Sequence, residues 1–170
     1  MVQNVVIVIL ALLHILSTIG WMGTAMFVVM VMTPTLLRLS LPTRIELILT
    51  LFPRLIRYVT VFATLTIVFG ALLAFATVGG SINSFALSNP WGFRIIVGAV
   101  LTLLAYFMAV GIAVPTLRKI IHLVEWMKQN PKDKPPAEMA SLQNRLKIST
   151  MIVLALLTII LVFMVAAARF

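Results

Sequence analysis

The sequence predicts an all-α integral membrane protein, a transmembrane bundle of four helices. Hydrophobic residues make up 62% of the chain, mean hydropathy is +1.18 and only 10% of residues are charged, values far outside the soluble globular range. Four apolar segments without an interior charge reach the ~20 residues that a helix needs to cross a hydrocarbon core about 30 Å thick. They are too long and too uniformly apolar for barrel strands, so helices should satisfy their backbone groups in lipid.

The predicted spans belong to a single transmembrane domain, residues 1–170, and cover about 5–33, 58–78, 95–114 and 148–168. The first span has no basic leader and no small-residue cleavage site after it. We therefore expect it to stay in the mature protein rather than to act as a signal peptide. Pro34 is expected to close this span.

The connection to the second span contains TRIELILTLF, residues 43–52, in which apolar residues alternate with polar ones at helical spacing. This pattern predicts a short amphipathic helix that lies along the membrane interface. Pro53 should then interrupt the chain before the second span begins.

The connections around the third span differ in character. GGSINSFALSNP, residues 79–90, carries the Gly, Ser and Asn residues of a turn, and Trp91 should anchor the start of the third helix at the interface. After Pro115, LRKIIHLVEWMK keeps helical spacing between basic residues, so the third helix should continue past the membrane. QNPKDKPP is expected to be a solvated turn. No internal repeat is evident in the sequence.

The net charge of +9 is distributed unevenly along the chain. Basic residues gather in the connections 34–57 and 115–147, whereas residues 79–90 have none and the two ends share only Arg169. The positive-inside rule then predicts cytoplasmic basic connections and extracytoplasmic N and C termini, in a multi-pass protein of the cell membrane. Anionic lipid headgroups are the expected partners of these charges, and nucleic acid is not. Partner subunits, in a membrane complex or a homo-oligomer, remain open.

Several kinds of chemistry are not expected from this composition. The chain has no cysteine, so a metal would need imidazole, thioether or oxygen ligands, or a prosthetic group. All the acidic residues fall in the basic connections, where they cannot form a buried acid and base within the bundle; they are Glu46, Glu125, Asp133 and Glu138. A hydrolase that uses carboxylates or a serine triad is therefore not predicted.

Two histidines are present, in very different surroundings. His122 lies in the basic extension of the third helix, three residues before Glu125, and should be a solvated interfacial residue. His14 lies inside the first span, where an ionisable side chain is costly unless it faces the bundle and has a partner. We therefore expect His14 to face inward, as a ligand or a hydrogen-bonding centre.

Methionines follow His14 along the first span. Residues four apart share a helix face, which predicts one continuous stripe formed by His14, Thr18, Met22, Met26 and Met30. An imidazole followed by thioethers suits copper(I), which prefers soft ligands. The alternative interpretation is that these methionines are flexible fillers of an apolar helix interface.

Short motifs in the first three helices give the sequence a family resemblance. The first span carries His14, Trp21 and Gly23 and ends in TPTL. The second begins with PRLIRY and has Gly70 near its far end, and the third begins with WGFR. These motifs resemble the copper-resistance D (CopD)-like membrane proteins and the related HemJ protoporphyrinogen oxidases.

The resemblance implies a bundle of four to five helices in which His14 binds haem b, as in the HemJ branch, or takes part in copper handling, as in the CopD branch. In the haem version we expect a methionine of this or another helix as the second axial ligand and Trp21 in the cofactor site. Arg94 begins the third helix about 10 Å from the depth of His14, within reach of a propionate; the alternative is that Arg94 only anchors the helix end at the lipid headgroups. In the copper version His14 passes the ion to Met22 and Met26.

The sequence departs from the family pattern at two places. Arg94 stands where those families tend to have lysine, and LAYF, residues 104–107, offers no histidine on the third helix. Haem binding still fits, because ligation by one histidine and one methionine needs a single imidazole. Three function classes stay open: a haem b protein of electron transfer or oxidation, a copper-handling protein, and a cofactor-free structural or accessory subunit.

Overall fold

The computed structural model of the chain describes residues 2–79, 85, 88–130 and 136–168. Most of the predicted turns at 79–90 and 129–136, together with Asp133 and Arg169, lie outside the described residues. Within the described ranges the chain forms long helices and no strand. The predicted all-α class is therefore confirmed.

Four helical rods are long and apolar enough to cross a membrane in the part of the chain that the structure describes. The first rod comprises α1 (Val2–Phe27), η1 (Val28–Met32) and α2 (Thr33–Arg38), and the second is α3 (Leu41–Thr77). The third comprises α4 (Pro90–Tyr106), η3 (Phe107–Ala113) and α5 (Val114–Gln129), and the fourth is α6 (Glu138–Ala168). They confirm the predicted four-helix transmembrane bundle.

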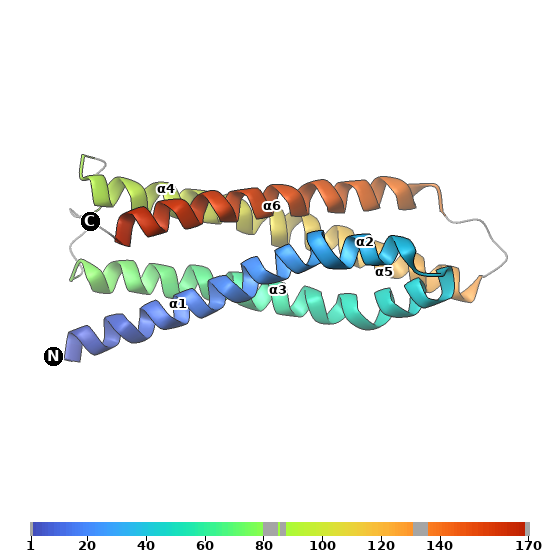
Figure 1. Cartoon of the computed structure of the whole chain (residues 1–170), viewed down its shortest axis with the longest axis horizontal. Helices are drawn as coiled ribbons and strands as arrows, with labels where there is room; N and C mark the ends of the chain where they lie inside the picture. Colours follow the sequence, from blue (N-terminus) through green and yellow to red (C-terminus); the bar gives the residue numbers. More distant parts are fainter. Residues whose placement is uncertain (1, 80–84, 86–87, 131–135, 169–170) are drawn as a thin grey trace.

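The rods form two helical hairpins. The first pairs α1 with α3 and the second pairs α4 with α6, while α5 packs against both α3 and α6. The turn between α2 and α3, the end of α5 and the start of α6 lie at one end of the bundle, and the start of α1 and the end of α6 lie at the other (Figure 1). The two basic connections are therefore on the same side of any membrane that the bundle crosses.

The segment TRIELILTLF does not form a separate helix along the interface, so that prediction was wrong. It is the first part of α3, which runs through Pro53 without a break. Ile48 and Phe52 are only 5% and 3% exposed and pack with residues of α5 and α6. An amphipathic pattern shows that one face of a helix must be buried, and here other helices bury it instead of lipid.

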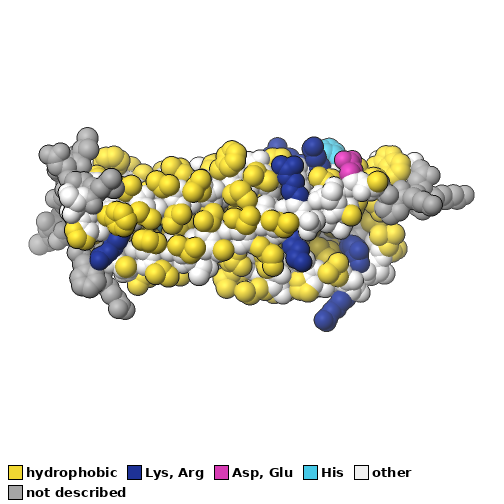
Figure 2. Space-filling view, turned by 90° about the horizontal axis from the view of Figure 1, so that it is seen from above, with side chains coloured by type: hydrophobic (Ala, Val, Ile, Leu, Met, Phe, Trp, Pro, Cys, Tyr) yellow, Lys and Arg dark blue, Asp and Glu magenta, His cyan; other side chains and the backbone are white. Residues whose placement is uncertain are grey.

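The bundle continues beyond the membrane at its basic end. At 1.5 Å per residue, α3 is about 55 Å long, almost twice the thickness of a hydrocarbon core. The third rod likewise continues to Gln129, which confirms the predicted extension. Figure 2 shows basic side chains gathered toward this end, whereas hydrophobic side chains cover most of the remaining surface.

The first and third rods each widen into a π-helix shortly before a proline. In η1 the N–H of Thr33 donates to Val28 O, and in η3 the N–H of Val114 donates to Ala109 O, five residues back in both cases. Pro34 and Pro115 follow directly. A proline ring clashes with the carbonyl four residues earlier, and a wider turn relieves this clash without ending the helix.

The two prolines reveal a repeat that the sequence analysis missed. Both begin the triplet Pro-Thr-Leu, as residues 34–36 and 115–117. The hydroxyl of Thr35 donates to Val31 O and that of Thr116 donates to Ile112 O, each at 2.7 Å and each four residues back. The first helical rod of each hairpin thus has the same local structure, a π-helix followed by Pro-Thr-Leu.

Candidate functional site

His14 faces α3 rather than lipid. Its Nδ1 atom lies 3.0 Å from the carbonyl oxygen of Thr66. A carbonyl can only accept, so Nδ1 carries the proton and donates, and Nε2 keeps its lone pair. Among the described residues Nε2 has no hydrogen-bond partner. The imidazole is therefore held in the tautomer that histidine ligands of metals usually adopt.

Gly70 provides the space that the imidazole occupies. A Cβ atom placed on Gly70 would lie 2.8 Å from Cε1 of His14 and 3.0 Å from its Nδ1. Contacts this short do not persist, so any larger residue at this position would push the ring away from α3. The glycine and the Thr66 carbonyl, one turn apart on α3, together form the seat of His14.

The inward face of α1 differs from the predicted methionine stripe. The buried residues that follow His14 lie three, seven, ten, eleven and eighteen positions after it, rather than at multiples of four; they are Ser17, Trp21, Thr24, Ala25 and, in η1, Met32. Steps of four residues advance about 40° too far at each step, because a helix has 3.6 residues per turn. Met22 is partly buried, but Met26 is 38% and Met30 61% exposed. The expected stripe therefore turns out of the bundle after Met22.

Trp21 fills the middle of the membrane-spanning core. It is 1% exposed and packs in one cluster with Ala63 of α3, Ala105 of α4 and Leu157 of α6. The two alanines are fully buried, and their small side chains leave room for the indole. This position makes Trp21 a packing residue that closes the bundle centre, and it leaves no space there for a cofactor.

Arg94 joins the two helices of the second hairpin. Its Nη1 donates to the carbonyl oxygen of Ala166 at 3.0 Å, near the end of α6. The last carbonyls of a helix lack partners within the helix and carry partial negative charge, so a cation is favourable there. A haem propionate would have to share Arg94 with this helix end.

Neither a known protein family, nor a curated protein, nor a solved structure matches this chain.

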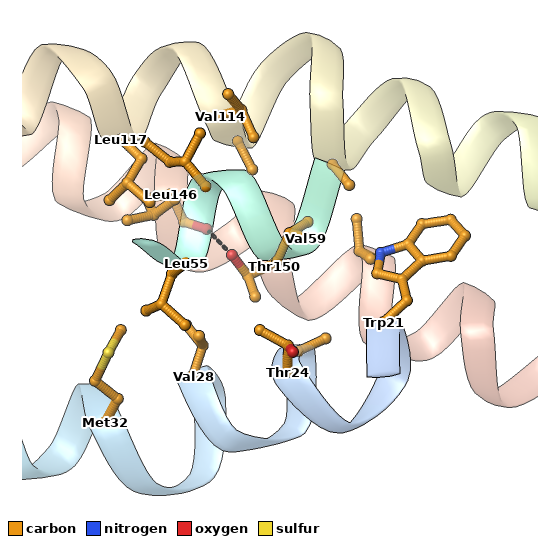
Figure 3. A pocket seen from close by; sticks show the side chains of 15 residues that line it. Trp21, Thr24, Val28, Met32, Leu55, Val59, Val114, Leu117, Leu146 and Thr150 are labelled. Atoms are coloured by element: carbon orange, nitrogen blue, oxygen red, sulfur yellow. Dashed lines mark hydrogen bonds between the residues drawn. The ribbon is translucent and has the colours of Figure 1, made fainter. Parts of the chain in front are cut away.

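The space available for a cofactor is limited in the middle of the bundle. An apolar cavity of about 70 Å³ lies beside Trp21 and between the two π-helices (Figure 3). The hydroxyl of Thr150, which lines it, donates to Leu146 O at 2.8 Å. Sites for drug-sized ligands measure roughly 300–1,000 Å³, so haem does not fit here. A cofactor on Nε2 of His14 would have to lie toward the end where the termini are.

The second hairpin has a methionine that lies against a glycine as His14 does, although here the side chain comes from the second helix of the hairpin and the glycine from the first. A Cβ atom on Gly98 would meet the end of the Met164 side chain, just as one on Gly70 would meet the imidazole. His14 lies seven residues, or about 10 Å, outward from Trp21, and Met164 lies seven residues outward from Leu157. Met164 thus lies at about the level of His14 along the bundle, on the opposite hairpin. Nothing in the sequence distinguishes Met164 from an ordinary core methionine.

Other candidate ligands do not converge. Among the described residues no three His, Cys, Asp or Glu side chains come together. His122, Glu46, Glu125 and Glu138 are exposed at the basic end, far along the rods from His14. A metal held inside the bundle would therefore depend on His14 with a thioether or with a prosthetic group.

Proposed function

We propose that this chain is a CopD-like or HemJ-like membrane protein in which His14 holds haem b or copper(I), for electron transfer or copper handling. The observation that carries the proposal is the hydrogen bond from Nδ1 of His14 to Thr66 O. A ligating histidine typically donates its second ring nitrogen to a carbonyl in this way, which fixes the ring and raises the basicity of the ligating atom.

The residues around His14 fit either group, with Met164 as the second donor. Histidine and methionine together ligate haem in electron-transfer proteins, and nitrogen and thioether donors suit copper(I). Haem b would supply one-electron chemistry when bound, whereas copper would be the cargo. Met26 is exposed, and Met22, although it packs against the core, is eight residues or about 12 Å along the same helix from His14, so we take Met164 as the partner of His14.

The chain's own residues position the ligand and shield it. Thr66 and Gly70 fix the plane of the imidazole, and Trp21 blocks water from reaching it through the bundle centre. Arg94 supplies positive charge at the terminal end of the second hairpin, where a propionate would be placed. With the basic connections in the cytoplasm, His14 would lie toward the extracytoplasmic face of the cell membrane.

The same hydrogen bond also supports a second candidate function, that of a cofactor-free structural or accessory subunit. It joins α1 to α3, and polar side chains that bond across helices stabilise helix pairs in lipid. In that case His14 is an interhelical clamp and Nε2 binds nothing.

The two candidates make opposite predictions for purified protein supplied with haemin or with copper(I). The ligand proposal expects a Soret band or bound copper(I) in the parent and in His122→Ala, and neither in His14→Ala with unchanged helical circular dichroism. His122 is exposed on α5, so this control should change the free energy of unfolding by no more than about 0.5 kcal/mol. If the parent bound neither haem nor copper(I) and His14→Leu were as stable as the parent, both proposals would fail: His14 would be neither a ligand nor an interhelical clamp.

A further inference from the structure

A groove of about 370 Å³ lies on the outer surface of the second hairpin, between α6 and η3. Ser141, Asn144 and Arg145 line one part of it, and all three side chains are exposed. Met108, Ile112 and Ile148 line the other part and are apolar. The groove therefore joins a polar, positively charged region to a hydrophobic one.

These two parts are arranged along the bundle axis. In α6 the polar residues come before Ile148, nearer to the basic connection between α5 and α6. Ile112 and Met108 belong to the π-helix η3, within the apolar stretch of the third rod. Residues 141–148 rise by about 10 Å along the helix, so the groove crosses from the basic zone into the apolar belt.

We propose that this groove binds one anionic phospholipid, with its phosphate on Arg145 and Asn144 and an acyl chain along Ile148, Ile112 and Met108. The positive charge of Arg145 favours an anionic headgroup, because a guanidinium forms strong paired hydrogen bonds with phosphate oxygens. Basic pockets between transmembrane helices at the membrane surface are typical sites for anionic headgroups. The apolar part of the groove favours a lipid over free phosphate, since phosphate alone would leave that part empty.

The site is independent of the proposed role of His14, because the groove opens on the outside of the second hairpin near the basic end. It also differs from a diffuse attraction of lipid to the basic connections. Lys147 belongs to the same helix, is exposed, carries the same charge and does not line the groove. Lys147→Gln is therefore a matched control for Arg145→Gln.

Native mass spectrometry of the full chain, released from nanodiscs of phosphatidylcholine with phosphatidylglycerol, can count the lipids that stay bound. We expect one phosphatidylglycerol on the parent and on Lys147→Gln. On Arg145→Gln its retention should fall about fivefold, the value that corresponds to ~1 kcal/mol for one basic residue near an anionic surface. Circular dichroism of each variant verifies that the bundle is folded.

Three results would overturn the proposal. Equal losses in Arg145→Gln and Lys147→Gln would show diffuse attraction rather than a site. Equal retention of phosphatidylcholine would show that the charge does not select the lipid. If millimolar inorganic phosphate displaced the lipid, the groove would be a phosphate site to which the acyl chain of the lipid contributes nothing. A third variant, Ile148→Ser, should weaken retention while Arg145 is intact, and full retention in this variant would show that the apolar part of the groove does not bind the lipid.

Discussion

Replacement of Gly70 by alanine tests the seat of His14 most directly. The added Cβ would lie 2.8 Å from Cε1 of the imidazole, so the ring must move by about 0.6 Å to reach an ordinary contact of 3.4 Å. The same movement stretches the 3.0 Å hydrogen bond to Thr66 O beyond the useful range. We expect a net loss of about 0.6–2.6 kcal/mol, since overpacking and the lost bond cost roughly 1.6–3.6 kcal/mol and alanine returns about 1 kcal/mol of helix propensity.

The assay is unfolding of the purified protein by SDS titration, followed by circular dichroism. Gly23→Ala is the matched control, because a Cβ there would meet nothing within 4 Å, and it should be neutral or slightly stabilising. The double variant Gly70→Ala with His14→Ala removes the clash, so the cost of Gly70→Ala should disappear in it. If Gly70→Ala lowered the free energy of unfolding equally in the parent and in His14→Ala, Gly70 would not be making space for the imidazole.

Three further outcomes are expected. If haem is bound, Met164→Leu should change the Soret and visible bands from six-coordinate to five-coordinate forms, whereas Met26→Leu, which faces outward, should leave them unchanged. A cysteine at Lys128 should react with an impermeant reagent only from the cytoplasmic side and one at Ser88 only from outside, and the reverse labelling would invert the topology. Trp21→Ala should lower the free energy of unfolding by about 3–5 kcal/mol, and a loss below 1 kcal/mol would contradict its central packing role.

The spans could be predicted because the bilayer itself sets their length. A segment of some twenty apolar residues without charge has few alternatives in lipid, and the four candidate helices confirm this. The burial of Ile48 and Phe52 could not be predicted in the same way. An amphipathic face needs an apolar neighbour, and whether lipid or another helix provides it depends on contacts far away in the sequence.

The candidate site was predictable only in part. The cost of an imidazole in lipid suffices to turn His14 inward, and it does lie against α3. Steps of four residues gave the wrong direction for Met26, because an α-helix has 3.6 residues per turn and the error grows with each step. The π-helix η1 begins at Val28 and therefore changes the direction only of later residues such as Met30, which the sequence did not reveal. The contact of Met164 with Gly98, which matches that of His14 with Gly70, can be recognised only in the folded hairpins.

The long α3 has a consequence for biosynthesis. A ribosome completes the first hairpin before it makes α5 and α6, the helices that later cover Ile48 and Phe52. During that interval only the first rod, through Met32 and its neighbours, packs against this apolar face. The part that α5 and α6 later cover projects past the hydrocarbon, and the bilayer surface is the nearest apolar phase that can shelter it. Assembly of the second hairpin then lifts the segment from the surface into the bundle, so a nascent chain stopped after residue 90 should adhere to lipid along a face that the finished protein hides.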